Sequence, residues 1–135
     1  MGQPVYMRYV LDTNVFIWLN DDPSKVSQAV YRIAADPSHI KFVSIVSIWE
    51  MQIKLQLGKL ALKSTLTEML AAQAQFSQFQ IMPLEVDHIL TLSRLSLGNH
   101  RDPFVRLIVA QAIYEQMPLI SYDSQLDQYP VQIIR

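Results

Sequence analysis

The sequence predicts an α/β protein in which helices cover a central, mostly parallel sheet. Short apolar runs alternate with stretches of helical periodicity, and this alternation is typical of parallel sheets. Half of the 135 residues are apolar and 17% are charged, which excludes a disordered chain. The length suits one compact domain, so we expect residues 1–135 to form one, with 1–6 as a candidate disordered extension.

Composition excludes several classes of function. The formal net charge is −1, so any nucleic-acid contact needs a local basic patch rather than a basic surface overall. The chain has no cysteine, which excludes disulfides, zinc-thiolate sites and thiol catalysis and fits a cytoplasmic protein. No apolar run approaches the roughly 18 residues of a membrane span, and the N-terminus lacks the pattern of a signal peptide. We therefore expect no contact with membranes.

Five short apolar runs have the length and composition of strands. They are Arg8–Leu11, Ile40–Val43, Gln80–Met82, Leu119–Ser121 and Val131–Ile134. Capping residues mark the helices between them. The expected helices follow Asn14, span roughly 25–35, run from Ser44 or Ser47 to about Gln56, run from Ser64 or Thr65 to about Phe76, cover Val86–Leu95, and run from Asp102-Pro103 to Gln116. The last is almost entirely apolar and should cross the core.

Four carboxylates stand where such a fold places a ligand site. Asp12 ends the first strand, Glu50 lies in an apolar helix, Asp102 precedes a helix, and Asp123 follows the fourth strand. Ligands of open α/β sheets bind beyond the carboxyl ends of the strands. Carboxylates gathered there repel one another unless a cation neutralises them, and oxygen ligands suit Mg²⁺ or Mn²⁺. Such an ion can activate water for attack on phosphorus.

Each acid also has a purely structural interpretation. Asp12 and Asp102 could be helix N-caps, Glu50 could pair with Lys54 one turn later, and Asp123 could cap a short helix at 124–128. Because three of the four flank predicted strand ends, a purely structural role for all of them is disfavoured. A loose basic cluster near Asp102 is a candidate phosphate-binding patch; it comprises Arg94, His100, Arg101 and Arg106.

Four blocks of sequence, in order, resemble the PIN-domain nucleases, and in particular the VapC-like toxins of toxin–antitoxin pairs. The blocks are Leu11-Asp12-Thr13-Asn14; Ser44 to Glu50 with Ile53-Lys54 and Gly58-Lys59-Leu60; His100 to Phe104 with Arg106 to Ala112; and Leu119 to Asp123 with Tyr129. Together they span nearly the whole chain.

The resemblance implies a three-layer α/β/α sandwich and metal-dependent cleavage of RNA. Asp12, Glu50 and Asp123 match the first, second and last acidic positions of the family, and Thr13 and Asn14 match the polar pair that orients the first acid. It also implies one or two divalent ions, Mg²⁺ or Mn²⁺, a small antitoxin that occupies the site, and a homodimer.

Val105 departs from the family pattern. The subgroup usually carries its third acidic residue here, and valine cannot bind a cation. Asp102, one turn earlier, could supply part of the missing charge. Two hypotheses follow: a metal-dependent ribonuclease that uses Asp12, Glu50, Asp102 and Asp123, with Arg101 and Arg106 steadying the phosphate, or a PIN-like binding module with weakened catalysis that binds an antitoxin, RNA or another protein.

Overall fold

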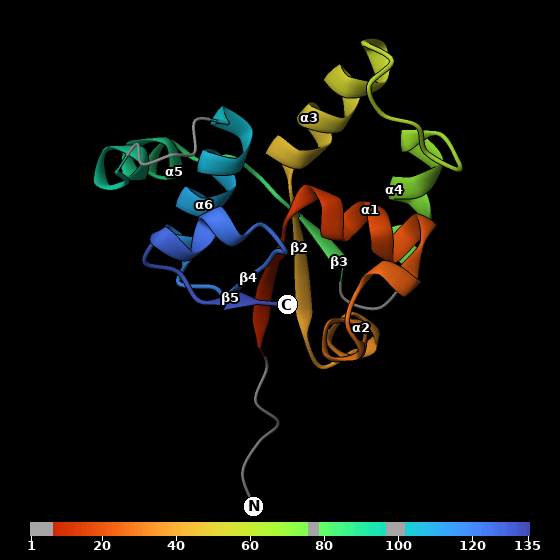
Figure 1. Ribbon diagram of the computed structural model, residues 1–135, viewed down its shortest axis with the longest axis horizontal. Helices are drawn as coiled ribbons and strands as arrows, with labels where there is room; N and C mark the ends of the chain where they lie inside the picture. Colours follow the sequence, from red (N-terminus) through yellow and green to blue (C-terminus); the bar gives the residue numbers. More distant parts are fainter. Residues whose placement is uncertain (1–6, 76–78, 97–101) are drawn as a thin grey trace, which may run out of the picture.

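A five-stranded parallel sheet forms the centre of the molecule (Figure 1). The computed structural model describes residues 7–75, 79–96 and 102–135, so the proposed extension at 1–6 and the basic residues His100 and Arg101 lie outside the described residues. The strand order is β3-β2-β1-β4-β5. The strands are β1 (Arg8–Leu11), β2 (Ile40–Ser44), β3 (Phe79–Met82), β4 (Leu119–Ile120) and β5 (Ile133–Ile134).

Each predicted strand is present, with small differences at the ends. All four strand pairings are parallel, where the sequence predicted a mostly parallel sheet. β3 begins one residue earlier than predicted, whereas β4 ends at Ile120, one residue before Ser121. β5 is reduced to Ile133–Ile134. These ends depend on the reach of neighbouring strands, which the apolar pattern of a single strand does not encode.

Alternating residues of each strand face two separate cores. On β1, Tyr9 and Leu11 belong to one cluster, which we call the first core, and Val10 belongs to the opposite cluster, the second core. Successive side chains of a strand point to opposite faces, so two faces of apolar residues need two layers of helices. The chain supplies both, and the result is the predicted three-layer α/β/α sandwich.

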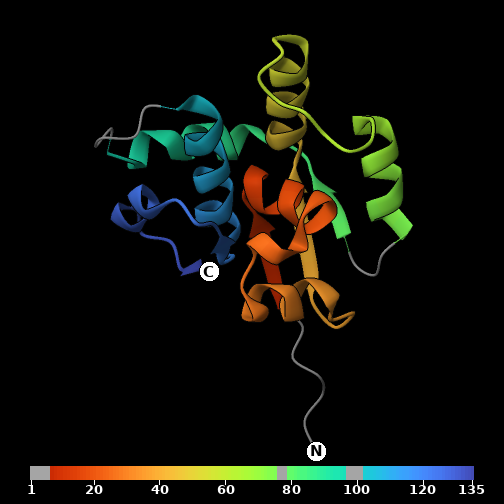
Figure 2. The same cartoon turned by 45° about the vertical axis from the view of Figure 1, so that its right-hand side comes forward.

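The helices divide between the two faces as Figures 1 and 2 show. One face carries α1 (Thr13–Asp21), α2 (Gln28–Ala35) and α4 (Leu66–Gln75), and the other carries α5 (Val86–Thr91) and α6 (Pro103–Glu115). The remaining α-helix of the described residues, α3 (Ile45–Gln56), follows β2 directly and rises beyond the carboxyl end of the sheet. It contributes Val46 to the second core and Met51 to the first.

Two predicted helices are shorter than expected. The helix predicted at roughly 25–35 begins at Gln28, because Val26 is extended and the Ser27 hydroxyl accepts a hydrogen bond from Val30 N at 3.1 Å. Pro23–Lys25 forms a separate 3₁₀ turn. The helix predicted over Val86–Leu95 is α5 followed by a 3₁₀ turn at Leu92–Arg94. The first difference arises where the Ser27 cap interrupts the apolar periodicity, and the second where the end of α5 tightens into a 3₁₀ turn.

The apolar helix α6 crosses the core as predicted. Ile108 and Val109 are fully buried in the second core. Gln111 is buried too, and it accepts a hydrogen bond from Ser44, the residue that caps α3. This contact ties α6 to the end of β2. In the described part of the chain, neither α6 nor any other helix has the length and apolar character needed to cross a membrane.

Leu119 offers a test of the core. Its side chain is 0% exposed in β4, so Leu119→Ala should lower the free energy of unfolding by about 2–5 kcal/mol. Leu57→Ala is the matched control, because Leu57 is 62% exposed at the end of α3 and should change stability by less than about 0.5 kcal/mol. Urea denaturation measures both. Equal losses would contradict the assignment of β4 to the interior.

Candidate active site

The candidate site lies beside β1, where the order in which the chain adds strands to the sheet reverses. From β1 the chain builds outward to β2 and β3 on one side and to β4 and β5 on the other. Open α/β sheets bind ligands at this switch point, beyond the carboxyl ends of the strands. A cavity of about 300 Å³ is found there. It is lined by Asp12, Thr13, Asn14, Trp18, Glu50, Lys54, Asp102, Val105, Tyr122 and Asp123.

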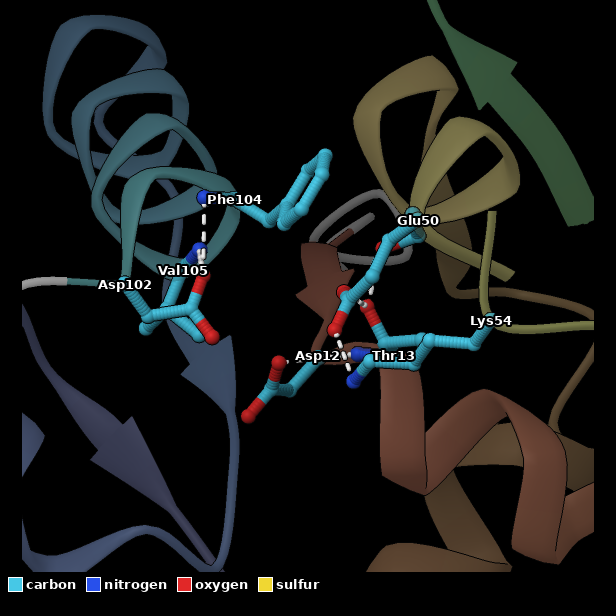
Figure 3. Close-up of polar contacts among 8 residues, drawn as sticks. Asp12, Thr13, Glu50, Lys54, Asp102, Phe104 and Val105 are labelled. Carbon is cyan, nitrogen blue, oxygen red and sulfur yellow. Dashed lines mark hydrogen bonds and ion pairs between the residues drawn. The ribbon is translucent and has the colours of Figure 1, made fainter. Parts of the chain in front are cut away.

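The structure therefore brings all four predicted acids to one cavity. They arrive from different parts of the fold: the end of β1, the middle of α3, the start of α6 and the segment after β4. In Figure 3, the carboxylates of Asp12, Glu50 and Asp102 face the space between α6 on one side and α1 and α3 on the other.

Asp12 is a buried acid at the edge of the sheet, and its pKa is raised. Its residue is 8% exposed, and its two oxygens accept hydrogen bonds from Thr13 N at 2.8 Å and from Ser121 Oγ at 2.7 Å. Burial raises the pKa of the Asp12 carboxyl, the two hydrogen bonds oppose this, and the charges of Glu50 and Asp123 raise it further. A cation in the cavity would relieve this cost.

Ser121 is a site residue that the sequence analysis missed. It was read as the last residue of a strand, yet its hydroxyl donates to Asp12 and accepts from Asp123 N at 3.1 Å. It thus links the ends of β1 and β4. The available signal for Ser121 is a serine at the end of an otherwise apolar strand. Its contact with Asp12 depends on which strand lies beside β4, and only the topology of the sheet shows that.

Two contacts hold Glu50, and it has both of the roles that the sequence suggested: it pairs with Lys54 and it lines the cavity. Its Oε2 lies 2.6 Å from Lys54 Nζ, which is the predicted helix pair, and its Oε1 lies 2.8 Å from the Thr13 hydroxyl. The Thr13 hydroxyl also lies 2.8 Å from Ser47 Oγ. A hydroxyl has one proton, so donation to Glu50 leaves Thr13 to accept from Ser47. Thr13 therefore orients Asp12 through its backbone N–H and Glu50 through its side chain.

Asp102 and Asp123 line the cavity and also cap helices. Asp102 accepts from Phe104 N at 2.9 Å and from Val105 N at 3.3 Å at the start of α6. Asp123 accepts from Gln125 N at 2.9 Å before the 3₁₀ helix Ser124–Gln128. Capping engages a carboxylate without removing it from the cavity. The structural and functional interpretations of these acids are therefore compatible.

Val105 lines the same cavity as the acids. It stands in the first turn of α6, beside Asp102, as Figure 3 shows. At the position where the family resemblance implies a third acid, this chain presents two methyl groups. Asp102 and Val105 share the cavity wall, so Asp102 is placed to supply charge on this side.

The donor set fits a hard divalent cation. The cavity offers carboxylate and hydroxyl oxygens, and none of the described residues that line it is a histidine; the chain has no cysteine. Among the residues that the structure describes, no three His, Asp or Glu side chains form a compact cage for an ion. Mg²⁺ is usually bound through one or two carboxylates and keeps several of its waters, so a wider ring of acids fits it. Mn²⁺ has similar ligand preferences.

Of the predicted basic residues, Arg94 and Arg106 are described, and neither lines the cavity. Arg106 is buried, and its Nη1 donates to Ser96 O at 2.9 Å and to Tyr129 Oη at 3.2 Å. It is not among the described residues that line the cavity, so its predicted contact with phosphate is replaced by a role in holding α6 against neighbouring segments. Arg101 lies outside the described residues. Among the described residues, the basic side chain that lines the cavity is Lys54.

The raised pKa of Asp12 predicts a pH-dependent effect on stability. A carboxyl whose pKa is higher in the folded chain adds stability below its unfolded pKa and loses it as the pH rises through the folded pKa. At pH 7, without divalent ions, charged Asp12 therefore destabilises the fold. Asp12→Asn should raise Tm at pH 7 by on the order of 3 °C, and the gain should vanish below about pH 4.

A divalent ion should reverse this order. Mg²⁺ or Mn²⁺ should raise Tm of the parent chain and leave Asp12→Asn nearly unchanged, because binding stabilises only the chain that binds. Asp127→Asn is the control: it removes an exposed ion pair with Arg135 at 2.8 Å and should give no gain. A lower Tm for Asp12→Asn than for the parent chain at pH 7 without ions would contradict the inferred cost.

Comparisons with known proteins agree with the fold and the order of the blocks. The family model of the PIN domain matches residues 9–132. Among solved structures, VapBC2 from Rickettsia felis bound to a promoter DNA fragment has a TM-score of 0.71 and 17% identity, covering 95% of this chain and 98% of that one.

DNA-bound VapBC from Salmonella typhimurium has a TM-score of 0.68 and 17% identity, covering 95% of this chain and 97% of that one. VapBC-5 from Mycobacterium tuberculosis has a TM-score of 0.61 and 23% identity, covering 95% and 98%. A search of curated proteins finds no match. These solved structures share the fold, and the family model covers most of the sequence. The chain belongs to the PIN-domain family.

Proposed function

We propose that this chain is a metal-dependent ribonuclease and the toxin of a toxin–antitoxin pair. The observation that carries the proposal is the convergence of Asp12, Glu50, Asp102 and Asp123 on one cavity at the switch point of the sheet. Membership of the PIN-domain family supports nuclease chemistry, and the fold shared with VapBC toxin–antitoxin structures supports the biological role.

In this proposal the four acids surround Mg²⁺ or Mn²⁺, and one or two of them bind the ion directly. Such an ion, when bound, neutralises the carboxylates, lowers the pKa of a water molecule and stabilises the charge that develops at phosphorus. The side chains present match this role, because carboxylate oxygens line the cavity. Asp12 has the central position: burial raises its pKa most, and the charges of Glu50 and Asp123 raise it further.

The remaining polar residues hold the acids in place. Ser121 and the backbone N–H of Thr13 fix both oxygens of Asp12, and the Thr13 hydroxyl fixes Glu50. Lys54 neutralises part of the charge of Glu50 and stands at the cavity, where its ammonium can attract a phosphate. Preorganised carboxylates of this kind lose little entropy when a ligand binds.

A protein partner is part of the proposal. Several large apolar side chains are exposed on α3 and α5, among them Trp49, which is 56% exposed, and Val86, which is 71% exposed. Exposed apolar surface of this kind is typical of protein contacts. We assign it to a small antitoxin and to a second copy of the chain in a homodimer, in a cytoplasmic complex.

Val105 supports a second candidate function. With a valine in the cavity wall, ion affinity is lower than five acids would give, and the chain could act as a PIN-like module that binds an antitoxin, RNA or another protein with weak catalysis. The two candidates share the same site and differ in turnover.

Nuclease assays with Mn²⁺ distinguish the candidates. We expect the parent chain to cleave single-stranded RNA, Asp12→Ala to lose at least about 100-fold in rate, and Val105→Asp to gain about tenfold in Mn²⁺ affinity or rate. Val86→Asp is the matched control, because it adds the same charge on α5, away from the cavity; it should leave Mn²⁺ affinity and cleavage rate unchanged, even where it weakens contact with a protein partner.

The outcomes separate cleanly. Activity that appears only in Val105→Asp would favour the weakened binding module. Absence of cleavage by both the parent chain and Val105→Asp, with circular dichroism showing both folded, would count against a nuclease.

A further inference from the structure

The cavity has an aromatic wall beside its acids. Trp18 from α1 and Tyr122 from the segment after β4 both line it. Their ring centroids lie 5.8 Å apart, and the ring planes are tilted by 53°. Neither ring takes part in the proposed ion binding, so the pair needs a separate account.

Core packing does not explain the position of Trp18. The neighbouring residues Ile17 and Leu19 pack against the first core, but Trp18 is not among the described side chains of either core. Asn14 stands four residues earlier on the same face of α1 and also lines the cavity. This face of α1 is therefore directed at the cavity rather than at the sheet.

The aromatic pair is held in place, and a positively charged side chain lies next to it. The Tyr122 hydroxyl accepts a hydrogen bond from Ser27 N at 2.8 Å, which fixes the ring from the side of α2. Lys25 is exposed, and its Nζ lies over the Trp18 ring, 5.8 Å from the ring centroid. Aromatic side chains combined with positive charge are the recurrent design of sites for single-stranded nucleic acid.

We propose that Trp18, supported by Tyr122, stacks an unpaired base of single-stranded RNA next to the acidic cavity; this inference rests on the nuclease function proposed above. A base is uncharged, so the acids do not repel it as they repel phosphate. The bases of a duplex are covered by their neighbours in the stack, so a free base face requires a single strand. Lys25 is placed to attract the phosphate of the stacked nucleotide.

The chain has two tryptophans, which makes the stacking directly observable. In Trp49→Phe, Trp18 is the remaining tryptophan, and pentauridylate RNA should quench its fluorescence saturably, both with EDTA and with Mg²⁺. A double-stranded RNA long enough to stay paired should quench it much less. An arginine-containing pentapeptide is the competing probe, because guanidinium groups also stack on indole rings. Quenching by the peptide but not by RNA would overturn the proposal in favour of a protein ligand.

Substitutions of Trp18 test the energetics in the otherwise unchanged chain. Trp18→Leu keeps an apolar side chain without a ring and should weaken binding of labelled pentauridylate by about 5- to 100-fold, whereas Trp18→Phe should stay within about threefold of the parent chain. In Mn²⁺ assays the loss should appear in KM rather than in kcat. Equal binding by the Leu and Phe variants would overturn the stacking site, and Tm of each variant checks that it is folded.

The two proposals fail in different ways. RNA-dependent quenching of Trp18 without any cleavage would leave the stacking site standing and remove the nuclease. Cleavage with an unchanged KM in Trp18→Leu would leave the nuclease standing and remove the stacking site. Absence of both quenching and binding in the parent chain would overturn the stacking site outright.

Discussion

The burial of the Asp12 carboxylate constrains the whole carboxyl edge of the sheet. A carboxylate at 8% exposure needs hydrogen bonds or a cation, because removing its charge from water is costly. Two donors meet this need, one from the next residue and one from Ser121 at the end of the neighbouring strand. The second donor exists only because β1 and β4 pair in parallel with Leu11 opposite Ile120. The register of the sheet and the chemistry of the site are therefore one arrangement.

The same constraint explains the contacts around Glu50. A second buried carboxylate near Asp12 adds repulsion, and the chain offsets it locally with Lys54 and the Thr13 hydroxyl. Thr13 serves both acids, through its backbone and its side chain. Sites of this kind hold like charges together at the expense of stability, which natural proteins accept where function requires it. A bound ion would relieve the remaining repulsion between Asp12 and Glu50.

The sequence predicted the fold in most of its parts and the site in its acids. Strands such as Arg8–Leu11 were clear because apolar runs end at polar residues, and α6 was clear because it is apolar on nearly every face. The start of α2 was missed because the Ser27 cap is local chemistry inside a longer apolar pattern. The roles of Ser121 and Arg106 depend on which segments become neighbours, and no spacing along one segment encodes that.

At Val105, the helix dipole and the repulsion among the acids favour different side chains. An acid in the first turn of α6 would gain about 0.3–1 kcal/mol from the helix dipole, so helix stability alone favours aspartate over valine there. Repulsion within the cavity acts in the opposite direction, because Asp12 already has a raised pKa next to Glu50 and Asp123. Valine lowers that repulsion and leaves Asp102 as the acid on the α6 side. Under the proposed function, valine at this position thus lowers the affinity for the ion and raises the stability of the metal-free fold. The balance between these two effects determines the rate of RNA cleavage.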